Sequence, residues 1–447
     1  MKKILNFIFL FVICEAAQAQ MADSTLRLSI KQAVDIALFN QKEVINAQLD
    51  VEIAKAKVKE TIGIGLPQIN GSFDFKDYVQ IPTSLIPAEA FGGLPGSFTT
   101  IQFGTRYNAL AGITASQLLF DPSYLIGVSA TKTYRELSEK NLQRTKLETA
   151  IAVTKAYYSV LLVRQRKNMV DANVIRLKKL FSDTKALYEN GFIEKIDLDR
   201  VHVAYNNITA EQDKITRYIE LSELTLKFQM GLSDKARLVI TDSLDELAIK
   251  QLPVTTLNPE PSKRIEYSIL QTQERLQTYN LKRYKSQYLP TLVLYGAIQA
   301  NAQRFKFNLF ESNYGWYPIG LIGATLSINI FDGFQKNYHI QQERLTLKKV
   351  KNEISNFENA VSLEVAASRA SLKDALAALQ TQDENLELAN SVAKTTKLKY
   401  DQGVGSNLEV LDAESSLKEA QANYFNALYD AIIAKINLDK SLGNFNY

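Results

Sequence analysis

Few residues of this 447-residue chain are of the types that carry out chemistry. His202 and His339 are the only histidines and lie far apart in the sequence, where solvated helix residues are the simpler interpretation. The chain has no G-x-S-x-G, H-E-x-x-H or G-x-x-x-x-G-K motif, and Gly63 and Gly65 lack the third glycine of a dinucleotide loop. The sequence therefore predicts a protein that is not an enzyme and that has no catalytic residues, no cofactor and no metal site.

Acidic residues do recur where a short turn leads into a new helix. Asp197 follows a turn at Gly191, and Glu409 and Asp412 follow a turn at Gly403. The helix dipole favours acids near a helix N-terminus, and this suffices to explain one or two of them. Any further role depends on the elements that position the turns.

Those elements are predicted from the placement of glycine and proline. The chain has 19 glycines and 10 prolines, and residues 128–190, 192–230, 334–402 and 407–442 contain neither. A helix over residues 334–402 would be roughly 100 Å long, at about 1.5 Å per residue. This exceeds the diameter of a compact domain and argues against a globular enzyme. The near balance of 52 basic and 48 acidic residues argues against nucleic acid as a partner.

Residues 1–19 have the order of a secretory signal peptide. Lys2 and Lys3 precede an apolar run over residues 4–13, and Ala17-Gln18-Ala19 forms a small-x-small cleavage site. A buried N-terminal helix is the alternative. Cleavage would leave a net charge of 50 − 47 = +3 and would remove Cys14, the only cysteine, so that disulfides and thiolate metal sites are excluded. A lipidated Cys14 is the other alternative, although Ile13 is a poor match to the small residue expected before it.

The remaining chain is two copies of one unit. Residues 112–121 align with 323–332 at an offset of 211, and Tyr188-Glu189-Asn190-Gly191 aligns with Tyr400-Asp401-Gln402-Gly403 at an offset of 212. A third match, between residues 66–69 and 289–292, has an offset of 223. Separate segments that share nearly one offset indicate internal duplication. The excess in the third is explained by a longer loop in the first copy, over residues 81–102.

Each copy is predicted to contain a helix, two strands, a long helix, a tight turn and a shorter helix. The first helix is expected from about Ser29 to Thr61. The strands alternate apolar and polar residues, as in Ile69, Gly71, Phe73 and Phe75 against their neighbours, although residues 291–299 alternate poorly. Such strands fit a membrane barrel with a wet lumen, and they fit a half-buried soluble sheet equally well. Aromatic residues at the second loop, where an interfacial girdle would lie, favour the membrane: Phe305, Phe307, Phe310, Tyr314, Trp316 and Tyr317.

Closure and packing both point beyond a single chain. Four strands cannot close a membrane barrel, since the smallest have about eight, and open edges are not tolerated in lipid. Three copies would supply twelve strands. In the long helices, Leu347, Val350, Ile354, Phe357 and Val361 recur at heptad spacing, which indicates helices packed side by side. An elongated periplasmic coiled-coil spacer or adaptor without a pore would explain the heptads but not the strands.

The order of elements, the duplication and the turn over residues 400–412 resemble the TolC family of outer-membrane efflux channels. The resemblance covers about Leu26 to Leu442. It implies a mainly α protein with a small β part, in which the duplicated helix-strand-strand-helix-helix unit forms a trimeric outer-membrane β-barrel continuous with a long periplasmic α-helical barrel. The implied function is the outer-membrane channel of a tripartite efflux or secretion system. The implied partners are two further copies in a homotrimer, a periplasmic adaptor (membrane fusion) protein, an inner-membrane pump of the RND or ABC type, and outer-membrane lipid.

The following boundaries are expected on this basis. The signal peptide is expected at residues 1–19, a belt segment at 231–262 and a C-terminal tail at 443–447. The first repeat is expected at 20–230, with a first helix, strands at about 68–80 and 103–120, a long helix 123–190, a tip 191–195 and a helix 196–230. The second repeat is expected at 263–442, with a first helix, strands at about 290–303 and 317–331, a long helix 333–402, a tip 403–406 and a helix 407–442.

The resemblance also assigns roles to the turns. It implies that Gly191, Phe192, Ile193, Gly403, Val404 and Gly405 contact the adaptor, and exposed apolar residues at a tip agree with this, although the glycines are also explained as helix stops. It implies a narrow periplasmic entrance formed by Asp197, Tyr400, Glu409 and Asp412, whose acids would become rings that favour cations. Tyr400 equally suits helix packing. Gly405 departs from the family, because members with a closed gate carry an arginine there.

Overall fold

The computed structural model describes residues 26–244, 249–250, 258–309, 311 and 313–445. The expected signal peptide, Cys14, Phe310 and part of the belt segment lie outside these residues. The described residues form two compact units, one of residues 26–51, 137–271 and 352–445 and one of residues 52–136 and 272–351. The helices α3 (Lys42–Gly63), α4 (Pro122–Glu189), α7 (Ile265–Ser286) and α8 (Gln335–Asp401) contribute to both.

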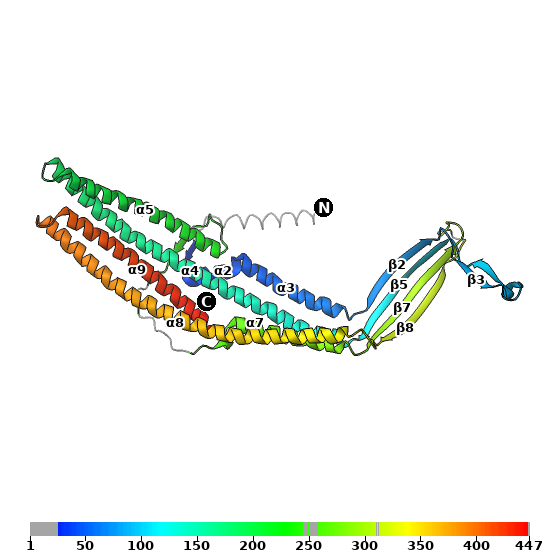
Figure 1. Ribbon diagram of the computed structural model, residues 1–447. Helices are drawn as coiled ribbons and strands as arrows, with labels where there is room; N and C mark the ends of the chain where they lie inside the picture. The colour runs from blue at the N-terminus through cyan, green and yellow to red at the C-terminus, as the bar shows by residue number, and fades with distance from the viewer. Residues whose placement is uncertain (1–25, 245–248, 251–257, 310, 312, 446–447) are drawn as a thin grey trace, which may run out of the picture. The chain divides into compact units, whose positions relative to one another are not determined.

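The predicted fold class is confirmed. The first copy has α3, β2 (Gln68–Asp77), β5 (Tyr107–Phe120), α4 and α5 (Lys195–Gln229), and the second has α7, β7 (Thr291–Arg304), β8 (Tyr317–Ser327), α8 and α9 (Asn407–Leu442) (Figure 1). The same order in both copies follows from the duplicated sequence. Within the described residues, no helix combines the length and the apolar character that crossing a membrane requires.

The strands of both copies form one antiparallel sheet. Its order is β2-β5-β7-β8, so that the two copies meet where β5 pairs with β7. In the register, Gly71 pairs with Ile113 and Ile113 with Ile298, which places the apolar residues of β2, β5 and β7 on one face. Expected strand residues 328–331 fall outside β8, because Ser327 pairs with Thr291, the first residue of β7, and no strand of the described residues continues the pairing beyond it. Strands β2 and β8 have no partner on their outer edges within the described residues.

The helices of the first unit pack through apolar residues that recur at intervals of three, four or seven along each helix. Val170, Leu177 and Leu180 of α4 are buried with Val201, Ile208 and Ile215 of α5. Val361, Leu372 and Leu379 of α8 are buried against α9, whose apolar residues also contact α4. Each long helix therefore has a shorter antiparallel partner, as Figure 1 shows for α4 with α5 and for α8 with α9.

Both strand-to-helix junctions use the same acidic residue. The Asp121 carboxylate accepts the backbone N–H of Ser123 at 2.7 Å and that of Tyr124 at 3.1 Å, at the start of α4. The equivalent Asp332 accepts the N–H of Lys336 at 3.1 Å, at the start of α8. A side-chain oxygen at this position satisfies N–H groups that have no partner inside the helix.

Two expectations about the first copy are wrong. The helix expected over 29–61 is broken into α2 (Ile30–Asn40) and α3, because Gln41 has extended backbone with ψ 128°. The long loop expected over 81–102 is an ordered hairpin of β3 (Thr83–Pro87), the short 3-10 helix η1 (Ala88–Phe91) and β4 (Phe98–Gln102). The remaining short elements are β1 (Leu26–Leu28), which pairs in parallel with β6 (Leu238–Ile240), and η2 (Pro261–Lys263).

Candidate functional site at the two helix turns

The two turns that connect long to short helices have the same backbone cap. Gly191 and Gly403 both have φ of 76°. In the first turn Gly191 N–H donates to Tyr188 O at 2.9 Å and Phe192 N–H to Leu187 O at 2.9 Å, and in the second Gly403 and Val404 make the corresponding bonds at 2.9 and 3.0 Å. This pair of bonds is the Schellman motif, in which glycine adopts the left-handed conformation at the least cost. The turns are thus sharp and well defined.

The following helices begin differently. Ser406 caps α9, since its hydroxyl accepts the Glu409 N–H at 3.2 Å. Glu194, in the same position before α5, makes no side-chain cap. Because a capping side chain stabilises a helix start by about 1 kcal/mol, the second turn is the better anchored.

The apolar residues of the turns are exposed with one exception. Phe192 is 76% and Val404 is 78% exposed. Ile193 is half-buried, so that its expected exposure is wrong. Each turn therefore presents one large apolar side chain.

The acidic residues occupy two environments. Glu409 and Asp412 are exposed and form no ion pair with another described residue. Asp197 is half-buried, with its carboxylate 3.7 Å from the Arg200 guanidinium. The structure therefore brings Glu409 and Asp412 together on the first turns of α9 and leaves their charges uncompensated, whereas the charge of Asp197 is partly balanced.

A contact that sequence reasoning missed joins the two turns. The Asn407 side-chain amide donates to the Asp197 backbone carbonyl at 3.1 Å, and the Asn407 side-chain carbonyl is buried without a partner. These residues are 210 positions apart and come from different copies. No local pattern marks such a pair, because the contact depends on how the two hairpins pack.

Two further residues near the second turn have packing roles. Tyr400 is half-buried beside the cluster that contains Val201 and Val410, and the Lys397 ammonium lies 5.1 Å from its ring centre. At Gly405, an added Cβ would lie 3.0 Å from Tyr400 N, so that a side chain there would press on the last turn of α8. The absence of an arginine at this position thus agrees with the space available.

Polar contacts continue from the turns along the helices. The Arg176 guanidinium of α4 lies 3.1 Å from the Glu414 carboxylate of α9, and Asn173, only 3% exposed, donates to Gln421 at 2.7 Å. The hairpin α4–α5 and the hairpin α8–α9 are therefore connected by side chains over several turns.

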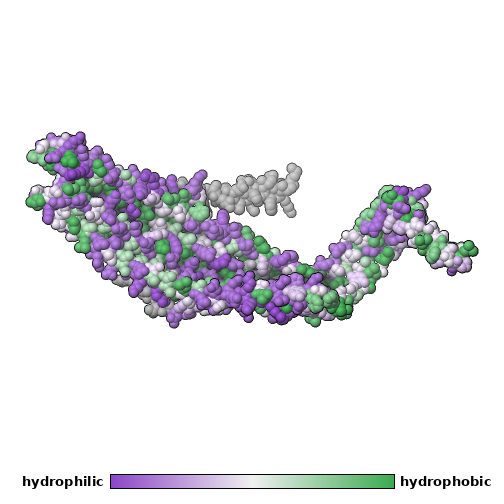
Figure 2. All heavy atoms as spheres, viewed as in Figure 1, coloured by the Kyte–Doolittle hydropathy of each residue, from purple (hydrophilic) through white to green (hydrophobic). Residues whose placement is uncertain are grey.

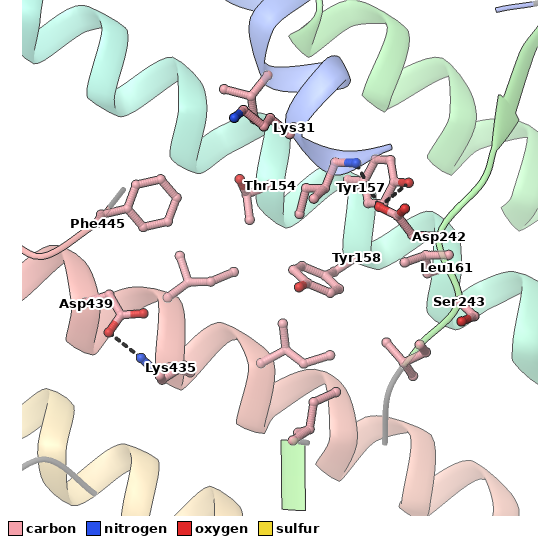
Figure 3. A pocket seen from close by; sticks show the side chains of 16 residues that line it. Lys31, Thr154, Tyr157, Tyr158, Leu161, Asp242, Ser243, Lys435, Asp439 and Phe445 are labelled. Atoms are coloured by element: carbon pink, nitrogen blue, oxygen red, sulfur yellow. Dashed lines mark hydrogen bonds and ion pairs between the residues drawn. The ribbon is translucent and has the colours of Figure 1, made fainter. Parts of the chain in front are cut away.

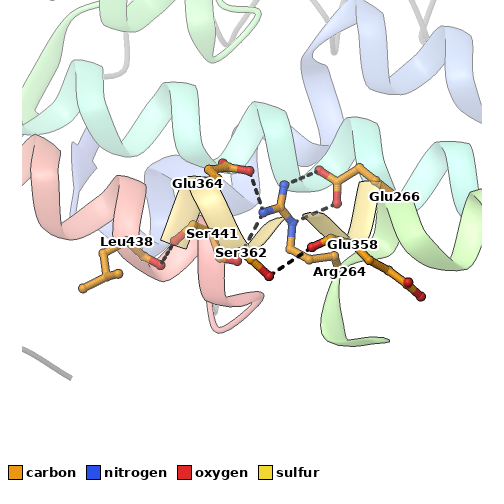
Figure 4. Close-up of polar contacts among 7 residues, drawn as sticks. All are labelled: Arg264, Glu266, Glu358, Ser362, Glu364, Leu438 and Ser441. Atoms are coloured by element: carbon orange, nitrogen blue, oxygen red, sulfur yellow. Dashed lines mark hydrogen bonds and ion pairs between the residues drawn. The ribbon is translucent and has the colours of Figure 1, made fainter. Parts of the chain in front are cut away.

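A buried arginine holds the other end of α9. Arg264, with a 5% exposed side chain, donates to both oxygens of Glu266 at 3.1 Å, to Glu364 at 3.1 Å and to the Ser441 carbonyl at 3.2 Å (Figure 4). Burial by itself would raise the pKa of Glu266, but the hydrogen bonds and charge of Arg264 outweigh it and lower that pKa. The arginine thus connects the start of α7 with α8 and with the end of α9.

The helical unit also contains a cavity of about 740 Å³ (Figure 3). At its edge the single proton of the buried Tyr157 hydroxyl is shared between two acceptors, the Asp242 carboxylate at 2.9 Å and the Leu28 carbonyl at 3.0 Å. Asp242 also accepts the Ile30 N–H at 2.8 Å. Burial, followed by the hydrogen bond to Asp242, raises the pKa of Tyr157. These contacts anchor the segment after β6 to α2 and α4, which is a structural role.

Comparison with known proteins gives a consistent result. Residues 265–444 match the family model described as Outer membrane efflux protein. The chain is 21% identical to Outer membrane protein TolC of Vibrio cholerae over 340 residues, 75% of this chain and 77% of the relative. It is 24% identical to Cation efflux system protein CusC of Escherichia coli over 436 residues, 93% of this chain and 85% of the relative.

The fold is shared with solved structures. The crystal structure of the outer membrane protein VceC from Vibrio cholerae superposes with a TM-score of 0.69 at 15% identity, over 93% of this chain and 96% of that one.

Proposed function

The chain belongs to the outer membrane efflux protein family, and on this premise we propose that it is the passive outer-membrane channel of a tripartite efflux or secretion system. Membership of this family supports efflux through the outer membrane as the general function. The chain is an outer-membrane protein whose helical part lies in the periplasm. The passive route through the channel, the adaptor and pump as partners, and the pump as the source of energy are what we propose in addition.

The observation that carries the proposal is the sheet with two open edges. Strands β2 and β8 flank a four-stranded sheet with an apolar face, and the order β2-β5-β7-β8 does not close on itself. Since lipid offers no hydrogen bonds to an open edge, the sheet requires strands from other copies. Three copies would form a twelve-stranded barrel, and the helices attached to each sheet would continue the same passage into the periplasm.

The turns suit a contact with a periplasmic adaptor. Phe192 and Val404 are exposed on rigid caps, and apolar side chains displayed on an ordered turn are typical of a protein contact. An inner-membrane pump of the RND or ABC type would then supply energy through the adaptor.

Among the described residues, no cluster of three metal-ligating side chains is available for metal chemistry.

The adaptor contact predicts a clear mutant phenotype. We expect the double variant Phe192→Asp and Val404→Asp to lose export while its trimers still assemble, because the charges oppose burial at the contact. Val404→Thr, which keeps the shape without a charge, is the matched control and should export normally. Normal export by the double variant would exclude the turns as the contact.

The entrance is proposed to lie at Glu409 and Asp412, with Asp197 and Tyr400 beside it. Uncompensated carboxylates repeated by threefold symmetry would favour cations. Changing Glu409 and Asp412 together to their amides should weaken block of the channel by divalent cations in planar bilayers. Glu419→Gln, an exposed acid farther along α9, should leave the block unchanged. Equal block in both variants would remove these acids from the entrance.

The complete proposal is tested by fractionation and conductance. Detergent-solubilised trimers from the outer membrane that form steady pores in planar bilayers would support it. Recovery of the mature chain as a soluble periplasmic monomer or dimer would contradict it and favour the coiled-coil spacer.

A further inference from the structure

The connection between β2 and β5 is a built arm rather than a loose loop. In residues 78–105, here called the arm, β3 and β4 pair from Thr83 with Gln102 to Pro87 with Phe98. At its end Gly92 and Gly96 have φ of 81° and 79°, and the Glu89 carboxylate accepts the Gly96 N–H at 2.6 Å. Backbone geometry and a side-chain bond thus give the arm a defined shape. The second copy has no counterpart of this hairpin among its described residues.

The surface of the arm is apolar and uncovered. Leu85 is 70%, Leu94 is 79% and Phe98 is 68% exposed. Leu85, Pro87 and Phe98 share one face of the hairpin, since Leu85 pairs with Thr100 and Pro87 with Phe98. Ala88 is the only buried residue of the arm, and Glu89 its only charged one. A two-stranded hairpin without a core is marginal in water, so that this face requires a partner.

Lipid does not fit as that partner. Phe75, Tyr107 and Phe307 contact one another at the base of the arm, with ring centres 5.7 to 6.4 Å apart, and such aromatic residues mark the membrane interface. The arm follows Phe75 in the chain and therefore lies beyond the acyl region. Contact with anionic headgroups would require basic residues, and the arm contains none. The flanking Arg106 is held by Asp77 at 2.9 Å. Figure 2 shows hydrophobic residues over the strands and the hairpin.

The position of the arm in the sheet points to a second copy. The arm leaves from the end of β2, which is an open edge. Tyr317 begins β8 at the end of the sheet where β2 ends, and it is level with Asp74, because Asp74 pairs with Leu110, Leu110 with Asn301 and Asn301 with Tyr317. Phe305 follows Arg304, which is level with Asp77 through Tyr107. If β8 of another copy pairs with β2, its Tyr317, which is 65% exposed, and its Phe305, which is 75% exposed, come to the end of the sheet from which the arm leaves.

We propose that the arm is a clasp between protomers, in which the face formed by Leu85, Pro87 and Phe98 packs on Tyr317 and Phe305 of the neighbouring copy. The inference rests on the proposed function, since it requires copies that close the barrel. In this proposal the arm stabilises the trimer through side-chain contacts that strand pairing at the sheet edges does not provide. Strand pairing provides backbone hydrogen bonds, and the clasp adds burial of apolar side chains at the end of the sheet, where part of that surface would otherwise face water.

Cysteine pairs test the contact directly. Cys14 is the only cysteine of the chain and lies in the predicted signal peptide, so that introduced thiols would pair only with one another. Leu85→Cys combined with Tyr317→Cys, after mild oxidation, should give a covalent trimer that reductant separates into monomers. Ser84→Cys combined with Tyr317→Cys is the matched control, because Ser84 pairs with Ile101 on the opposite face and should cross-link severalfold less.

A stability measurement provides the second test. Replacing residues 82–103 by a short Gly-Ser turn, or changing Leu85 and Phe98 together to Ser, should lower severalfold the fraction of trimer that survives heating in SDS. Thr83→Ser should not. Trimers that show neither cross-linking nor a loss of stability would overturn the clasp and leave the channel intact. Cross-linking of Leu85→Cys to a different protein would overturn it as well, whereas the absence of any trimer in the unaltered chain would refute the proposed function itself.

Discussion

The two copies stabilise their shorter helices with one backbone design and two different side chains. Gly231 follows α5 with φ of 66°, and its Cβ position lies 2.6 Å from the Asn40 carbonyl. Gly443 follows α9 with φ of 70°, and its Cβ position lies 2.9 Å from the Lys263 carbonyl. In both joints the end of the shorter helix rests on the chain just before α3 or α7. Only glycine fits, because of both the conformation and the close backbone.

The polar residue of each joint differs. Gln41 is buried in the first, where its amide donates to the Phe228 carbonyl at a long 3.5 Å. Arg264 takes the equivalent place in the second, at the offset of 223 residues, and reaches two carboxylates as well as the Ser441 carbonyl. The two joints thus share one backbone conformation but differ in their polar residue, which makes a weak neutral contact in the first and a charged network in the second. The second joint therefore depends much more on a single side chain than the first.

The largest expected effect is therefore an asymmetry between the joints. Arg264→Met should lower the free energy of unfolding by about 3–5 kcal/mol, because it leaves Glu266 and Glu364 without their buried partner. Gln41→Met should cost only about 1 kcal/mol, the usual net value for a neutral hydrogen bond. Denaturant unfolding of the two variants in detergent provides the comparison. Equal losses of unfolding free energy in the two variants would mean that the ion pairs of Arg264 add no stability beyond that of a neutral hydrogen bond.

Substitutions of the glycines that end α9 and α8 should have the next-largest effect on stability. Gly443→Ala combines a left-handed backbone with a contact against Lys263, and we expect a cost of about 2–4 kcal/mol. Gly403→Ala has the same conformation but no atom within 4 Å of its Cβ position, so that about 1–2 kcal/mol is expected. The midpoint of thermal unfolding should separate them. A greater loss for Gly403→Ala would show that close packing at the joint is unimportant.

The turns provide a smaller contrast. Ser406→Ala removes the cap of α9 and should cost about 1 kcal/mol, while Glu194→Ala should be nearly neutral because Glu194 makes no cap bond. Hydrogen exchange of the first amides of α9 and α5 is the appropriate measurement, since the effect is local. Faster exchange in α5 of the second variant would contradict the assignment.

The pH dependence should be the smallest effect. The pKa of Glu266 is lowered below its usual 4.5, so that its contribution to stability is complete above pH 4.5 and is lost as the pH falls through the folded pKa. Unfolding measured between pH 7 and pH 3.5 should show this loss in the unaltered chain. Arg264→Met should lack the Glu266 part of the dependence, whereas Gln41→Met should retain it. The same pH profile in both variants would exclude the Arg264 contacts as its cause.

Much of the fold follows from local patterns in the sequence. The helices α4, α5, α8 and α9 begin and end within one or two residues of the positions set by glycine, proline and heptad spacing. The caps at Gly191 and Gly403 follow from the same signals. The break at Gln41 does not, because no breaker residue marks it and the helix is interrupted only where the end of α5 packs. The half-burial of Ile193 is likewise not marked by any local pattern in the sequence.

The site divides in the same way. Two glycine-capped turns with apolar tips and following acids could be predicted from the sequence alone, because periodicity and left-handed caps are properties of a few consecutive residues. Three features could be recognised only in the folded chain: Asn407 donates to the backbone of Asp197, Arg264 binds Glu266 and Glu364, and the segment after β2 is an apolar hairpin. The contacts of Asn407 with Asp197 and of Arg264 with Glu364 join residues 210 and 100 positions apart, and their energy depends on burial and on geometry between elements, which no local pattern encodes.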